Sequence, residues 1–168
     1  MCELSKNCRK IKRKKGLARM KLVIQRVKRA KVEVERKVVG KINHGFLILL
    51  GVTHTDTQEE VDYLVKKVCQ LRVFEDENQK MNLNVQQVEG SLLVVSQFTL
   101  YANCKEGNRP SFTEAATPDQ AEKLYESFCQ KCRENDIPTE QGEFGANMQV
   151  ELLNDGPVTI VLERNHKE

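Results

Sequence analysis

Two short polar stretches interrupt apolar parts of this 168-residue sequence. Ser96-Gln97-Phe98-Thr99 follows the apolar run at 92–95, and Asn154-Asp155-Gly156-Pro157-Val158-Thr159 separates two later apolar segments. Each has a plain structural explanation, because a strand can reach the surface at Ser96 and a hairpin often turns at Asp-Gly. The proline after Gly156 is nevertheless unusual in a tight hairpin, since it removes a ladder donor. A rigid Gly-Pro step fixes the directions of its carbonyl oxygens, which suits a recognition site.

The sequence lacks the signatures of several enzyme classes. It contains no P-loop, no dinucleotide-binding glycine pattern and no G-x-S-x-G nucleophile elbow. Its histidines, His44, His54 and His166, lie beside a predicted strand or near the end of the chain, where turn and solvent positions are the more typical role. The pattern therefore favours neither a nucleotide cofactor nor a Ser-His-Asp triad.

Among the six cysteines, only Cys129-Gln-Lys-Cys132 has a spacing that metal and redox sites use. A structural zinc ion needs two further ligands at matched spacing, and the sequence offers no second C-x-x-C and no H-x-x-x-H. We interpret the pair as two positions of one helix, and we expect neither a metal site nor a cofactor.

The charge is unevenly distributed along the chain. Residues 1–19 hold eight basic side chains and one acidic side chain, whereas residues 20–168 hold 19 basic and 23 acidic ones. We predict that residues 1–19 form a disordered basic extension and that the folded domain spans residues 20–168. The extension is either a nucleic-acid arm or nuclear address, or a remnant of an upstream start. A nucleic-acid-binding accessory protein acting through this extension is the alternative to an enzyme.

No apolar run approaches the ~20 residues that a membrane-spanning helix needs. The first residues also lack the apolar stretch of a secretory signal. We therefore expect a cytoplasmic protein with reduced thiols and no membrane association.

Residues 20–168 show alternating strand and helix patterns. Apolar alternation and apolar blocks predict strands at 21–35, 38–42, 46–50, 91–100, 148–153 and 158–162, the last two joined as a hairpin. Capping boxes predict helices that begin at Thr57, with Glu60, and at Thr117, with Gln120. The predicted fold class is α/β (α+β): a small mixed β-sheet that curls toward a barrel, with two main helices packed on it.

The two polar stretches resemble the paired motifs of the D-aminoacyl-tRNA deacylase family, also called D-tyrosyl-tRNA deacylases. The motif S-Q-F-T-L is complete at residues 96–100, and N-x-G-P-V-T is complete at residues 154–159. Further resemblance covers Gln25-Arg26-Val27 and segments 80–84, 108–112 and 144–148, so that it extends from Met20 to about Leu162. A related class that acts on mischarged L-alanine carries P-Q-A-T-L and G-P-Y-T instead.

The resemblance implies hydrolysis of the ester that joins a D-amino acid, or mischarged glycine, to the 3′-terminal adenosine of tRNA. It also implies a homodimer with active sites at the subunit interface, in which a cis Gly-Pro step enters the partner's site. Gly156 and Pro157 of one chain then face Ser96, Gln97, Phe98 and Thr99 of the other. The carbonyls of Gly156 and Pro157 hold the substrate's amino group, and an L side chain collides with this backbone.

We expect catalysis from residues 96–99, with the amides of Phe98 and Thr99 stabilising the oxyanion. Water is the expected nucleophile, because no base stands beside the Thr99 hydroxyl in the sequence pattern. Arg26 is expected to brace the Gly-Pro loop, the alternative being a surface cation. Phe144 and Met148, with Phe98, are expected to wall the adenine pocket, the alternative being core packing.

Overall fold

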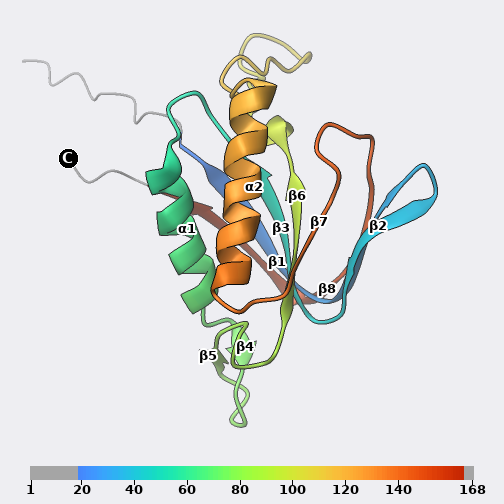
Figure 1. The fold of residues 1–168 in the computed structure, drawn as a ribbon, viewed down its shortest axis with the longest axis vertical. Coiled ribbons are helices and arrows are strands. Elements are labelled where there is room, and N and C mark those ends of the chain that lie inside the picture. The colour runs from blue at the N-terminus through green and yellow to red at the C-terminus, as the bar shows by residue number, and fades with distance from the viewer. Residues whose placement is uncertain (1–18, 165–168) are drawn as a thin grey trace, which may run out of the picture.

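The computed structural model describes residues 19–164, so the predicted basic extension at residues 1–19 lies outside the described residues except for Arg19, whose Nη1 is 3.5 Å from Glu60 Oε1. The elements, in chain order, are β1 (Lys21–Val34), β2 (Lys37–Ile42), β3 (Gly45–Gly51), α1 (Gln58–Gln70), β4 (Phe74–Glu75), β5 (Met81–Leu83), β6 (Ser91–Ser96), the 3-10 helix η1 (Phe98–Tyr101), α2 (Pro118–Glu134), β7 (Thr139–Gln141) and β8 (Gln149–Glu163). Figure 1 shows α1 and α2 side by side over one face of the sheet.

The main sheet has the order β2-β1-β3-β6-β7, and β8 pairs with the free side of β1. The β3–β6 and β6–β7 pairs are parallel and the pairs that involve β1 are antiparallel. The sheet nearly closes on itself, because a Cβ on Gly40 of β2 would lie 2.6 Å from the carbonyl oxygen of Gln141 in β7. The predicted mixed, barrel-like sheet with two helices is confirmed.

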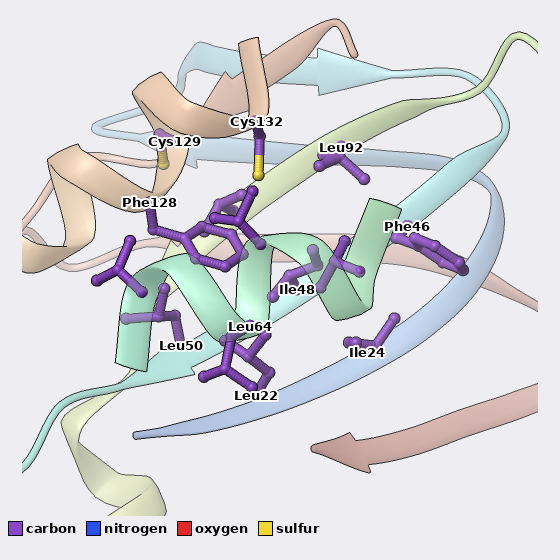
Figure 2. Packing of buried hydrophobic residues seen from close by; sticks show 14 of the residues in the cluster. Leu22, Ile24, Phe46, Ile48, Leu50, Leu64, Leu92, Phe128, Cys129 and Cys132 are labelled. Atoms are coloured by element: carbon purple, nitrogen blue, oxygen red, sulfur yellow. The ribbon is translucent and has the colours of Figure 1, made fainter. Parts of the chain in front are cut away.

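Strand β3 is buried on both faces, as its uninterrupted apolar sequence predicts. Phe46, Ile48 and Leu50 point toward the helices and pack with Leu64 of α1 and Phe128 of α2, an arrangement that Figure 2 shows. Leu47 points the other way, into a second cluster of β1, β2 and β6 side chains inside the curled sheet. The rigid centre of the fold thus reaches the end of β6, where the first polar stretch begins.

The two helix starts differ from each other in how they are capped. At α1 the predicted capping box is present, with the Thr57 amide donating to Glu60 Oε2 at 2.7 Å. At α2 the helix does begin after Thr117, but the predicted capping box is wrong, because the Thr117 side chain makes no capping bond. Gln120 instead donates to the carbonyls of His54 at 3.0 Å and Asp56 at 3.1 Å, which ties α2 to the loop after β3.

The predicted hairpin at residues 154–157 is wrong. Strand β8 continues through this segment, and both of its halves pair antiparallel with β1. Between the pairs Gln25–Thr159 and Val27–Asn154, β8 advances five residues while β1 advances two, so the extra residues bulge outward. The two apolar segments share one partner strand, and this pairing holds the Gly-Pro step on the outside of a continuous sheet.

Cys129 and Cys132 occupy two buried positions of α2, as interpreted from their spacing. Burial raises the pKa of the Cys129 thiol to about 12. Within residues 19–164 no group of three metal-ligating side chains is present, and none of the helices there is long and apolar enough to span a membrane.

Candidate active site

The first polar stretch, residues 96–99, forms a sharp corner between β6 and η1, and we call it the corner. The sequence predicted a strand as far as Leu100, but β6 ends at Ser96 and a single 3-10 turn follows. The turn is fixed by main-chain bonds, with the Gln97 amide donating to the Leu50 carbonyl at 2.8 Å and the Leu100 amide to the Gln97 carbonyl at 3.3 Å. The amides of Phe98 and Thr99 open this turn, where a helix leaves its first N–H groups without an intrahelical acceptor.

The corner forms the rim of a pocket of about 560 Å³. Ser96, Gln97 and Phe98 line it together with Phe144 and Met148, so the structure brings five of the predicted site residues to one cavity. The other walls are small or apolar side chains: Val52, Val95, Phe112, Ala115, Ala116, Pro118, Ala121, Gly145, Ala146 and Val150. Thr99 is exposed just outside the pocket, and its hydroxyl accepts a hydrogen bond from the Gln97 side chain.

No ionisable side chain lines this pocket among the residues that the structure describes. The two described histidines are engaged elsewhere, since the Nε2 atoms of His44 and His54 lie 2.6 Å and 2.8 Å from the carbonyls of Val88 and Thr113. The polar groups available at the rim are therefore main-chain amides, hydroxyls and one carboxamide. Such a site can bind and polarise a carbonyl group but holds no general base of its own.

The second polar stretch, residues 154–159, is the bulge of β8. The Gly156–Pro157 peptide bond is cis, and both residues are exposed. The Asn154 side chain holds the bulge from within, because its Oδ1 accepts from the Val158 amide at 3.1 Å. Gly156 has φ +125°, and a Cβ there would lie 3.0 Å from Arg26 Nη2, so the position requires glycine.

Arg26 of β1 supports the bulge from below. Its side chain is only 6% exposed, which excludes the alternative of a surface cation. Its Nε donates to the Asp155 carbonyl at 3.1 Å, and its Nη1 donates to the Val73 carbonyl at 2.6 Å. The guanidinium thus joins the residue before Gly156 to the segment that follows α1.

Comparison with known proteins shows the family of this chain. The family model described as D-Tyr-tRNA(Tyr) deacylase matches residues 23–163. This chain belongs to that family. D-aminoacyl-tRNA deacylases of Thermosipho africanus and of an Exiguobacterium species are 57% and 58% identical to it, over 86% and 87% of this chain and 97% and 99% of their own lengths.

Two solved structures are similar to this chain. The structure titled c-Myc DNA Unwinding Element Binding Protein has a TM-score of 0.81 and 43% identity, and covers 87% of this chain and 99% of its own. The structure titled as a probable eukaryotic D-amino acid tRNA deacylase has a TM-score of 0.75, with 88% and 100% coverage. Its identity is 17%, so it supports the fold alone.

In this deacylase-family chain the corner and the bulge do not share a cavity. Neither Arg26, Gly156 nor Pro157 lines the pocket, although Val150 of the same strand does. From Val150 to Asn154 an extended strand advances about 13 Å, and the bulge begins only there. Within one chain, therefore, the Gly-Pro step stands away from the amides of Phe98 and Thr99.

Sequence reasoning missed Phe112 as a site residue. Its ring packs edge-on against Phe98, with the ring centroids 5.0 Å apart, and it lines the pocket beside it. A lone aromatic residue in a polar loop rich in Gly, Asn and Pro was the available indication. Phe144 lines the pocket and also packs toward the core, because its ring lies 6.0 Å from that of the buried Tyr125.

A buried carboxyl group, that of Asp56, supports one wall of the pocket. Its two oxygens accept from the amides of Met20 and Thr53, each at 2.8 Å. Thr53 pairs with Ala115 of the pocket wall, so Asp56 fixes the strand end from which that wall is built. Burial raises the pKa of Asp56 to about 6, against the lowering effect of the two amides.

Proposed function

We propose that this protein is a D-aminoacyl-tRNA deacylase. It hydrolyses the ester between a D-amino acid, or mischarged glycine, and the 3′-terminal adenosine of tRNA, and so proofreads the substrates of translation. The observation that carries the proposal is the corner itself, where residues 96–99 present main-chain amides at the rim of an apolar pocket without an acid or base. An aminoacyl ester is already activated, so charge stabilisation is the main requirement.

Water attacks the ester carbonyl, and the Phe98 and Thr99 amides stabilise the tetrahedral oxyanion. One donor of this kind typically contributes about 10²–10³ in rate. Collapse of the intermediate breaks the bond to the ribose oxygen, which leaves the free amino acid and the 3′-hydroxyl of tRNA. The substrate's own ribose 2′-hydroxyl assists the attacking water, since the pocket supplies no base.

Thr99 positions rather than attacks. Its hydroxyl is exposed and accepts from the Gln97 carboxamide, so its environment holds no group able to take its proton. Gln97 and Ser96 complete the polar rim.

The terminal adenine occupies the apolar part of the pocket. Phe98, Phe112 and Phe144 offer aromatic faces, and Met148 offers a polarizable one. The pocket volume of about 560 Å³ is within the ordinary range for a ligand of nucleoside size.

The active form is a homodimer in which the bulge of one subunit closes the pocket of the other. The position of the bulge supports this, because along β8 it begins about 13 Å beyond Val150 of the pocket wall, and a second copy would bring a bulge to the corner. Leu153 and Val161, on either side of the bulge, are 41% and 60% exposed, and they offer the apolar contact area that such an interface needs.

The cis Gly156–Pro157 step acts as the chiral filter. Its carbonyl oxygens hold the substrate's amino group, so that an L side chain would overlap the Gly-Pro backbone while a D side chain points away. Rejection by overlap needs no contact with the side chain, which explains why many D-amino acids and glycine are accepted.

A substrate of this kind belongs to the compartment of translation, and we infer a cytoplasmic protein. The accessory nucleic-acid-binding role considered from the sequence depends on residues 1–19, of which 1–18 lie outside the described residues, and the family membership favours the hydrolase.

The direct test compares D-Tyr-tRNA with L-Tyr-tRNA, using the full chain. We expect release of D-tyrosine and no measurable release of L-tyrosine above the spontaneous rate. Equal rates on the two substrates would refute the chiral filter, and absence of hydrolysis of both would refute the deacylase.

A further inference from the structure

One hairpin of this chain carries a charge opposite to that of the rest of the folded part. Residues 28–41, the second half of β1 and most of β2, hold six basic and two acidic side chains, and we call this segment the basic hairpin. The remainder of residues 20–168 holds 13 basic and 21 acidic side chains. The positive charge is thus concentrated at one place on an otherwise acidic molecule.

Most cations of the basic hairpin are exposed and unpaired. Lys31 is neutralised by Glu33 at 2.7 Å and by Glu151 at 3.5 Å. The other five have no carboxylate partner within residues 19–164, and all are exposed: Lys28, Arg29, Arg36, Lys37 and Lys41. Unpaired cations on a rigid strand pair remain available to an anionic partner.

The basic hairpin adjoins the pocket. Val150, a pocket residue, pairs with Val32, and Lys37 pairs with Val34, which is two residues farther along β1. Paired residues and alternate residues of a strand share one face, so Lys37 lies on the pocket side of the sheet, about 6.6 Å along the strands and two interstrand spacings of about 4.8 Å across from Val150. Arg36 is in the two-residue turn next to it, and Figure 1 shows this end of the hairpin extending beyond the helices at the side of the molecule.

We infer that the basic hairpin binds the backbone phosphates of the tRNA acceptor end, with Arg36 and Lys37 nearest the pocket. The inference rests on the proposed function, in which the nucleotide in the pocket is the 3′-terminal adenosine of the tRNA. The phosphates preceding the terminal adenosine leave the mouth of the pocket and meet exposed cations within one or two nucleotides. The contact carries no sequence information, which suits an enzyme that accepts many tRNAs.

The test neutralises the two cations nearest the pocket in the full chain, as Arg36→Gln with Lys37→Gln. We expect KM for D-Tyr-tRNA to rise about tenfold at ~0.1 M salt with kcat unchanged, and the slope of log(kcat/KM) against log salt to fall by about 1.5. The matched control is Lys66→Gln with Lys67→Gln on α1, two exposed cations on an element that contributes no residue to the pocket, and it should change neither quantity.

Two further arms make the outcomes distinguishable. D-tyrosyl-adenosine carries the same ester without any phosphate, and its KM should be the same for wild type and both variants. The charge-conserving pair Arg36→Lys with Lys37→Arg should keep the wild-type KM for D-Tyr-tRNA within about twofold. If the neutralised variant equals the control on D-Tyr-tRNA, the basic hairpin is not the phosphate site; if wild type hydrolyses neither substrate, the deacylase proposal itself fails.

Discussion

The corner and the bulge are both polar interruptions of the sheet, and they are stabilised in different ways. The corner is fixed by main-chain bonds at the end of β6, and it belongs to a pocket lined by residues of one chain. The bulge is exposed, and it depends on two side chains, Asn154 within it and Arg26 beneath it. Under the proposed function the corner supplies the chemistry, whereas the bulge supplies selection and acts on the pocket of a second subunit.

The largest expected effect comes from removing one amide of the corner. Phe98→Pro deletes the Phe98 N–H, and proline fits the first position of a helical turn. Gln97 before it has φ −141° and ψ 84°, outside the α region that a following proline disfavours. We expect kcat on D-Tyr-tRNA to fall about 10²–10³-fold, as for other oxyanion donors.

The control for this change is Phe98→Ala, which removes the ring and keeps the amide. It should raise KM, because the ring lines the pocket, with a smaller effect on kcat than Phe98→Pro has. Equal kcat values for the proline and alanine variants would show that the amide does not contribute to catalysis.

The next effect tests whether corner and bulge come from different chains. Arg26→Ala removes the bond to the Asp155 carbonyl of the bulge and the bond to the Val73 carbonyl, and we expect about a 100-fold loss of activity. When this variant is refolded together with Phe98→Pro in equal amounts, half of the dimers are mixed, and each mixed dimer has one intact site. Activity should then recover to about one quarter of the wild-type value.

Arg133→Ala is the matched control for the bulge variant, since Arg133 also donates to a main-chain carbonyl, that of Thr139, but lies outside the site. It should lower thermal stability without a comparable loss of kcat. If mixing the two inactive variants restores nothing, corner and bulge do not combine across a dimer interface.

Much of this comparison was accessible from sequence, because local patterns determine the elements involved. The apolar block at 46–50 predicted a strand buried on both faces, and Thr57 with Glu60 predicted a helix start, both of which depend on neighbouring residues alone. The first motif and segment 144–148 also pointed to residues that lie together, since Ser96, Gln97, Phe98, Phe144 and Met148 line one pocket.

The errors arose where a distant partner decides the structure. Asp-Gly predicted a hairpin, but the pairing of both halves of β8 with β1 keeps the chain straight and turns the same residues into a bulge. Gln120 matched a capping box, but three distant carbonyls recruit its side chain. The basic hairpin was not predicted, because residues 20–168 are acidic in total and the acidic side chains elsewhere offset its positive charge.

The buried carboxyl of Asp56, which accepts from the amides of Met20 and Thr53, makes the stability of the fold depend on pH. Burial raises the pKa of Asp56 to about 6 in the folded protein, above its usual 3.8. The folded state therefore binds the proton more tightly than the unfolded state does. This adds to the free energy of unfolding in full below about pH 4, and the added stability is lost as pH rises through 6. The free energy of unfolding should therefore contain a contribution from Asp56 that is about 1 kcal/mol larger at pH 5 than at pH 7.

Denaturant unfolding of Asp56→Asn measures that contribution as a difference in pH dependence from wild type. Asp76→Asn is the matched control, because Asp76 also accepts two amides, those of Asn78 and Lys80, and these bonds lower its pKa. Its stabilising effect is therefore lost only at lower pH, and it should leave the pH 5 to 7 interval unchanged. A wild-type pH dependence in Asp56→Asn would mean that another group titrates there.

The smallest effect is expected at Thr99, and it separates the two mechanisms that the corner allows. If water attacks, Thr99→Ala keeps the amide that stabilises the oxyanion and loses only a hydroxyl that is already bonded to the Gln97 side chain, so kcat should stay within about threefold of wild type. If the hydroxyl attacks, activity should fall at least 100-fold, and wild type quenched during turnover should carry a tyrosyl ester detectable by mass spectrometry. The exposed position of Thr99, outside the pocket that holds the other corner residues, favours the first outcome. A small loss of kcat in Thr99→Ala together with a large loss in Phe98→Pro would assign the chemistry to main-chain amides. Any residue except proline at position 99 keeps such an amide.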